Sequence, residues 1–164
     1  MELPVEDHPE PADIEVLETQ IRREASAAMG LGDEADLAIF VRDAGRIVAG
    51  ISGWTWGDCC ELQSLWVQPS LRGRGLGTQL LAAAEAAAAA RGCAQTVHFT
   101  YAFQARSLDE RNGYKLVGQV ENFPSGTDVL WYRKRLNPPK PHPAGNGPGP
   151  ATPAKTPPLA PSGG

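Results

Sequence analysis

The chain has 164 residues, enough for one domain with a hydrophobic core. Its formal net charge of −4 argues against a nucleic-acid binder, because no basic surface emerges from the sequence. The three cysteines are an odd number and fit free thiols in a reducing cytoplasm better than a disulfide framework. No Cys-x-x-Cys or histidine cluster indicates a metal site, and no apolar segment approaches the length of a transmembrane helix. We therefore expect a cytoplasmic domain that binds no metal, nucleic acid or membrane.

The first 36 residues are strongly acidic and contain one predicted helix. Residues 1–12 carry prolines and acids, which predicts a flexible N-terminus. A helix is predicted over residues 14–29, with Asp13 as its cap. Its apolar positions fall at helical spacing on one face: Ile14, Leu17 and Ile21. Eleven of the nineteen acidic residues lie in this part of the chain, either as a solvated surface or as an acidic wall beside a substrate groove.

Six strands are predicted after this helix. In chain order they cover residues 37–42, 46–56, about 60–67, 95–101, 114–120 and 129–134. The first three follow one another through short turns, which predicts an antiparallel meander. Gly50 and Gly53 inside the second strand indicate a bulge or a close backbone approach.

A glycine-rich turn follows the third strand and leads directly into a helix. The turn contains Gly73, Gly75 and Gly77, so backbone N–H groups can face outward with no Cβ in the way. The unpaired N–H groups and the positive dipole end of the helix point to the same place, which predicts a phosphate site. Arg72 and Arg74 add positive charge to it. The spacing fits neither a P-loop nor a dinucleotide-binding fingerprint.

The helix after the turn is rich in alanine and runs to about Arg91. Because it joins the strand at 62–67 to the strand at 95–101, these two strands are predicted to be parallel. A short helix is predicted from Gln104 to about Arg111. Residues 137–164 hold ten of the fifteen prolines, with many glycines and alanines, and are predicted to be a disordered tail.

The turn carries a resemblance to a known superfamily. Arg72-x-x-Gly75-x-Gly77, after the apolar strand, resembles the acyl-CoA-binding signature of the GNAT N-acetyltransferases. The resemblance covers residues 13–136 and implies an α/β fold of the α+β kind, with a mixed, mostly antiparallel central sheet flanked by helices. It also implies acetyl-CoA as cosubstrate and an amine as acceptor. The residues implied to bind acetyl-CoA are Leu65, Trp66, Val67, Arg72, Gly73, Arg74, Gly75, Leu76, Gly77 and Thr78.

A second local pattern, Phe103-Gln104-Ala105 followed by Asn112-Gly113-Tyr114, is similar to a bacterial branch of this superfamily. The chain departs from that branch between the two motifs, so Asp109 occupies the place of a tyrosine that protonates the departing CoA thiolate in many relatives. An aspartate is ordinarily ionised at pH 7 and is then a poor proton donor. Nearby hydroxyl groups, or water, are alternatives to it: Tyr101, Ser107 and Tyr114.

Glu61 is the candidate general base for the amine. It stands eleven residues before Arg72, the separation found in the histone-acetylating branch. Simple strand alternation predicts that Glu61 lies on the same side of the sheet as Leu65 and Val67. His98 on the neighbouring strand is the rival base. The resemblance further implies that the third and fourth strands diverge and that the Leu65 N–H binds the thioester carbonyl.

The acidic N-terminal region predicts a cationic acceptor, either a small molecule or a protein amine. The residues behind this expectation are Glu15, Glu18, Glu24, Asp33, Glu34 and Asp36. The predicted function is transfer of an acetyl group from acetyl-CoA to such an amine. The alternative is a CoA-binding or interaction module of the same fold without catalytic activity, and a homodimer is left open.

Overall fold

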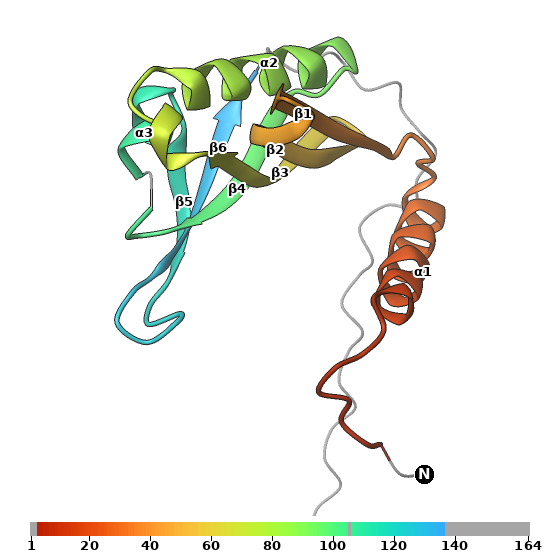
Figure 1. The fold of residues 1–164 in the computed structure, drawn as a ribbon. Helices are drawn as coiled ribbons and strands as arrows, with labels where there is room; N and C mark the ends of the chain where they lie inside the picture. The colour runs from red at the N-terminus through yellow and green to blue at the C-terminus, as the bar shows by residue number, and fades with distance from the viewer. Residues whose placement is uncertain (1–2, 105, 137–164) are drawn as a thin grey trace, which may run out of the picture.

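The structure is a computed structural model that describes residues 3–104 and 106–136 (Figure 1). The predicted tail at 137–164 lies outside the described residues. The helical segments are α1 (Pro11–Met29), a single 3-10 turn (Pro69–Leu71), α2 (Leu76–Ala90) and α3 (Arg106–Arg111). The strands are β1 (Ala35–Asp43), β2 (Arg46–Trp56), β3 (Cys59–Val67), β4 (Gln95–Tyr101), β5 (Lys115–Val120) and β6 (Val129–Arg135).

The six strands form one sheet in the order β1-β2-β3-β4-β6-β5. Each neighbouring pair is antiparallel except β3 and β4, which are parallel and are joined through α2. The predicted meander, the predicted parallel pair and the predicted mixed sheet are therefore confirmed.

The predicted bulge lies in the β2–β3 pair. The register shifts between Ser52 and Gly53, and Gln63 on β3 has no Cα partner on β2. A Cβ atom added at Gly53 would lie 2.0 Å from the carbonyl oxygen of Glu61, so only glycine fits this close approach. The extra residue also changes which side chains of β3 share a face of the sheet.

Helix α2 covers one face of the sheet, called here the covered face, and lies across β1, β2 and β3 (Figure 1). It buries four side chains there: Leu80, Leu81, Ala84 and Ala88. These pack against buried strand residues that include Leu37, Ile51, Leu62 and Tyr132. The alanines allow close packing of the helix, and the larger side chains come from the strands.

Helix α1 differs from the sequence prediction. It begins at Pro11, where a proline suits the first turn, and no side chain caps it, so the predicted Asp13 cap is wrong. None of its residues is buried, and Leu17 and Ile21 on the predicted apolar face are 62% and 69% exposed. Figure 1 shows α1 standing apart from the sheet. Among the described residues, no helix is long and apolar enough to cross a membrane.

Two other boundaries shift because of local hydrogen bonds. The carbonyl oxygen of the Gln104 side chain accepts hydrogen bonds from the Thr100 hydroxyl and the Tyr101 N–H, both at 3.2 Å. Gln104 thus closes the loop after β4, and α3 begins only at Arg106. Tyr114, predicted as the first residue of the fifth strand, donates its N–H to the Asp109 carbonyl at 3.0 Å and precedes β5.

Candidate active site

Strands β3 and β4 pair only at their first residues and then diverge. Their register joins Cys59–Glu61 to Gln95–Val97, and the described residues show no pairing beyond that point. We call the space between the later parts of the two strands the splay. It agrees with the divergence that the resemblance implies, and it leaves backbone groups of β3 without a strand partner.

The backbone direction identifies which residues of β3 face the splay. The Gln68 N–H donates to the Val48 carbonyl at 2.9 Å and therefore points toward β2. Backbone groups alternate sides along a strand. The backbone N–H and C=O of Trp66 therefore also point toward β2, whereas those of Leu65 and Val67 point toward the splay. The Val67 carbonyl accepts a hydrogen bond from Nε of Arg72 at 2.9 Å. The Leu65 N–H is thus left on the side where the resemblance places a thioester.

The glycine turn opens the N-terminus of α2. Gly73 and Gly75 have φ of 75° and 81°, a conformation that favours glycine, and Gly75 is the residue before the helix. No side chain caps α2, and the Gln79 N–H is bonded to the Gly75 carbonyl at 3.1 Å. The N–H groups of the first turn therefore remain available to an anion. Arg72 and Arg74 are exposed beside them.

The prediction that Glu61 shares a face with Leu65 and Val67 is wrong. The bulge at Gln63 reverses the alternation, so Leu65 and Val67 pack against the core on the covered face. Glu61 pairs with Trp54 on the opposite face, called here the open face. Nε1 of Trp54 donates to Oε2 of Glu61 at 3.2 Å. This contact was missed from the sequence, although a hairpin places such residues opposite each other.

Charged side chains on the open face are separated by sign along one row of cross-strand partners. The row runs across the sheet through Asp36, Trp54, Glu61, Val97, Arg133 and Lys115. The two acids stand on β1 and β3, and the two bases stand on β6 and β5. The Trp54 and Trp56 rings lie together at 6.1 Å between centroids, beside the acidic part.

His98 and Asp109 form a buried pair on the covered face. Nε2 of His98 lies 3.0 Å from Oδ1 of Asp109, and the residues are 8% and 4% exposed. The rings of Tyr114 and Tyr132 lie 4.7 and 5.9 Å from the imidazole. Glu61 and His98, the two candidate bases, therefore lie on opposite faces of the sheet.

The hydroxyl groups considered as proton donors differ in environment. The Tyr114 hydroxyl is buried and accepts a hydrogen bond from Thr96 at 3.0 Å, and burial raises the pKa of this phenol above its ordinary value. Tyr101 lies on the open face, stacked on Phe103 at 5.5 Å. The Ser107 side chain lies outside the described part of the structure.

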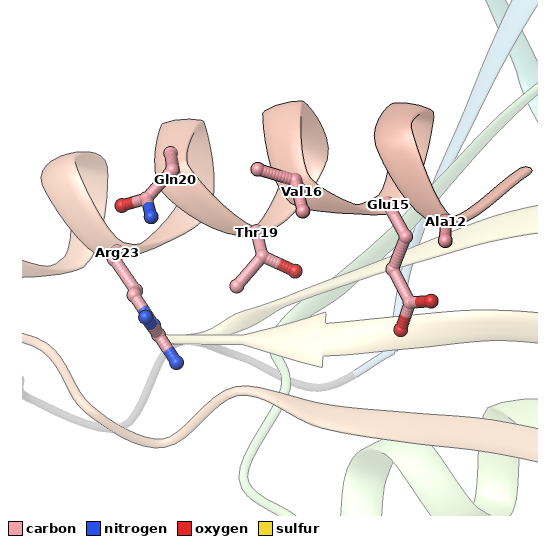
Figure 2. A pocket seen from close by; sticks show the side chains of 6 residues that line it. All are labelled: Ala12, Glu15, Val16, Thr19, Gln20 and Arg23. Carbon is pink, nitrogen blue, oxygen red and sulfur yellow. The ribbon is translucent and has the colours of Figure 1, made fainter. Parts of the chain in front are cut away.

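A shallow hollow runs along α1, outside the splay. Figure 2 shows its lining, which comes from that helix alone: Ala12, Glu15, Val16, Thr19, Gln20 and Arg23. None of the predicted catalytic or CoA-binding residues lines it, and of the acidic residues behind the predicted cationic acceptor only Glu15 does. In the described ranges, no group of three His, Cys, Asp or Glu side chains is arranged to hold a metal ion.

Known proteins share both the sequence pattern and the fold. Residues 1–114 match the sequence model of the Acetyltransferase (GNAT) family. An acetyltransferase of Agrobacterium fabrum is 34% identical over 111 residues, which are 67% of this chain and 81% of the relative. Blasticidin-S acetyltransferase of Streptomyces morookaense is 35% identical over 88 residues, 51% of this chain and 62% of that protein.

A crystal structure from Agrobacterium tumefaciens, assigned to the acetyltransferases, superposes with a TM-score of 0.74 at 28% identity. The alignment covers 82% of this chain and 99% of that one. With the family match to residues 1–114, it agrees with the mixed sheet flanked by helices described above. The chain belongs to the GNAT family of acetyltransferases.

Proposed function

We propose that the chain transfers the acetyl group of acetyl-CoA to a cationic amine that approaches the open face at Glu61. The observation that carries this proposal is the end of the β3–β4 pairing at Glu61 and Val97. A carboxylate, an unpaired strand edge and, after the following turn, an uncapped helix N-terminus follow one another along the chain from this point, which supports a single site.

The turn at 72–78 binds the phosphates of CoA in this proposal. The first-turn N–H groups of α2 attract an anion through hydrogen bonds and the helix dipole. The glycines at 73, 75 and 77 let the phosphates approach the backbone closely, and Arg74 adds a charge that reaches solvent. Arg72 has a second role, because its bond to the Val67 carbonyl fixes the turn to the end of β3.

The edge of β3 binds the pantetheine arm and the thioester. Leu65 and Val67 contribute backbone groups, so their side chains are free to pack in the core. The Leu65 N–H donates to the thioester carbonyl, where negative charge develops during attack. Trp66 is 47% exposed, and its side chain has no role in the transfer step.

Glu61 acts as the base on the acceptor side. An amine must lose a proton to attack the thioester, and most amines are protonated at pH 7. The Trp54 indole N–H binds one carboxylate oxygen of Glu61 at 3.2 Å and so orients the side chain. The other oxygen remains for the amine.

In the sequence, the acidic N-terminal region predicts a cationic acceptor. In the structure, the support comes from the open face of the sheet instead. Asp36 and Glu61 flank Trp54, and tryptophan faces beside carboxylates attract cations. Blasticidin-S acetyltransferase is one relative that is named for a small-molecule acceptor, which favours a small molecule over a protein amine. Arg133 stands two strands beyond Glu61 in the same row and is a cation that attracts a carboxylate. Amines that also carry a carboxylate are therefore the substrates to compare with purely cationic amines.

The alternative, a CoA-binding module without catalysis, is favoured by one feature. Asp109 stands where many relatives have a proton-donating tyrosine. CoA binding alone does not separate the two functions, whereas amine-dependent release of free CoA does.

The experiment has a binding arm and a turnover arm. Acetyl-CoA at about 100 times its Kd stabilises a binding protein by about 2.7 kcal/mol, so it should raise the melting temperature. Arg72→Glu combined with Gly75→Asp should remove that shift, whereas Arg46→Glu at the start of β2 is the control that keeps it. A wild-type chain with no shift at millimolar acetyl-CoA would refute both functions.

The turnover arm measures free CoA with cationic, neutral and carboxylate-bearing amines. Cationic amines should react fastest, and faster turnover with anionic amines would contradict the acceptor proposal. Glu61→Gln should lower the rate most at neutral pH and less at alkaline pH, where free amine is already abundant. The matched control is Glu121→Gln in the β5–β6 loop. A pH profile that is unchanged in Glu61→Gln would transfer the role of base to water.

A further inference from the structure

The buried pair of His98 and Asp109 has no role in the function proposed so far. His98 is the first residue of β4 beyond the paired segment, because the last register partner on that strand is Val97. Its side chain lies on the covered face, beside the start of the splay. A titratable pair at this place needs an explanation, because polar groups are seldom buried without a structural or chemical role.

The contacts of the imidazole leave one ring nitrogen unused. Asp109 from α3 lies 3.0 Å from Nε2, and the rings of Tyr114 and Tyr132 lie against the imidazole from the neighbouring chain segments. Nδ1 is buried and has no hydrogen-bond partner among the described residues. Since the carboxylate accepts from Nε2–H, Nδ1 is the atom that can exchange a proton with a ligand.

The sheet places His98 and the proposed base on opposite faces at the same point of the sheet. Glu61 is the register partner of Val97 and lies on the open face, and His98 follows Val97 on the covered face. When the amine attacks the thioester from the side of Glu61, the sulfur leaves from a different side. The covered side of the splay, where His98 lies, is the position opposite the base.

We propose that Nδ1 of His98 protonates the sulfur of CoA as it leaves, and that Asp109 is a positioning residue that holds the ring. The inference rests on the proposed function. The amine nitrogen bonds to the carbonyl carbon, the C–S bond breaks, and the sulfur leaves with the electron pair. His98 gives its Nδ1 proton to that sulfur, and the proton of the amine passes to Glu61 and then to water, from which His98 is protonated again.

The first test uses the wild-type chain and needs no variant to fold. With ¹⁵N-labelled histidine, the Nδ1 resonance of His98 is followed by NMR while CoA or desulfo-CoA, which lacks the sulfur, is added to saturation. CoA should move the Nδ1 resonance and desulfo-CoA should not, while His8 near the N-terminus serves as the reference. Equal spectra with both bound ligands would overturn the role of His98 and leave the proposed function intact. Binding of neither ligand would overturn the proposed function, and this inference with it.

The second test separates chemistry from packing. His98→Gln should lower kcat about 100-fold, the usual contribution of a general acid, and change the KM for acetyl-CoA by less than about threefold. Asp109→Asn should lower kcat less, because the amide oxygen can still accept a hydrogen bond from Nε2–H and hold the ring, but no longer carries a charge. Thr96→Val is the matched control, since Thr96 is also buried on this face of β4 and forms one side-chain hydrogen bond, to Tyr114. It should lower stability and not kcat, and a folded His98→Gln with unchanged kcat would contradict the proposal.

Discussion

The two faces of the sheet differ in packing and in chemistry. The covered face carries α2, the hydrophobic core and the buried His98–Asp109 pair. The open face carries Glu61 with Trp54, and large aromatic side chains that remain between 38% and 49% exposed: Phe40, Trp66, Phe99 and Trp131. One face therefore provides the stability, and the other is available to a substrate.

This difference shows how a single sheet can hold two chemical environments at one point. At the end of the β3–β4 pairing, Glu61 on β3 and His98 on β4 project into opposite environments. Glu61 is half-buried beside a tryptophan, and His98 is packed in the interior. The proposed proton acceptor, Glu61, and the proposed proton donor, His98, are kept apart there without a long loop. The arrangement depends on the alternation of β3, which the bulge at Gln63 sets.

The largest effect is expected from removing the glycine that permits the bulge. In Gly53→Ala the new Cβ would lie 2.0 Å from the Glu61 carbonyl oxygen and 2.9 Å from the Leu62 Cα, so backbone must move. We expect a loss of more than about 4 kcal/mol of unfolding free energy, measured by urea denaturation. Gly32→Ala, which meets no atom within 4 Å, is the control. Equal stability of the two variants would show that the bulge is not required.

A second prediction compares the helix on the covered face with the helix that stands apart. Leu81→Ala on α2 should cost about 2–5 kcal/mol, because Leu81 is 2% exposed in the core. Leu17→Ala on α1 should change stability by less than about 0.5 kcal/mol, because Leu17 is 62% exposed. The same denaturation experiment measures both. A cost of 2 kcal/mol or more for Leu17→Ala would mean that α1 packs against an apolar surface in solution.

Much of the sheet could be predicted because its strands are bounded by clear turn signals. The strands Arg46–Trp56 and Gln95–Tyr101 were predicted to the residue, since Ala44-Gly45 and Gly92 set their starts. The glycine turn was predicted with its helix for the same reason. Such features depend on a few neighbouring residues, so a single sequence contains them.

The parts that failed depend on contacts between distant residues. Gly53 indicated a bulge, but not that the extra residue would be on β3, and so Glu61 was placed on the wrong face. The apolar stripe of α1 predicted a helix, but not that none of its residues would be buried. His98 and Asp109 are eleven positions apart, and only the packing of α3 against β4 brings them together. Tertiary packing, unlike turn chemistry, leaves no local pattern.

The last effect, which is expected only at alkaline pH, concerns two adjacent cysteines that project to opposite faces. Cys60 lies on the covered face and is 0% exposed, and burial raises its thiol pKa from 9.0 to about 12. Cys59 is half-buried beside the open face, and burial also raises its pKa.

Above pH 9 the unfolded chain releases the Cys60 proton and the folded chain keeps it, so stability should fall as pH rises from about 9 toward 12. In Cys60→Ala the slope of unfolding free energy against pH should be shallower by up to about 1.4 kcal/mol per pH unit. Cys59→Ala should change the slope less, because its thiol is less deeply buried. Urea denaturation at intervals between pH 8 and 11 measures both slopes. Cys60→Ala should also lose some stability at every pH, because its side chain is smaller and leaves a space in the core. Equal slopes in the two variants would mean that both thiols titrate alike, and that the two faces do not differ in solvation at this point of β3.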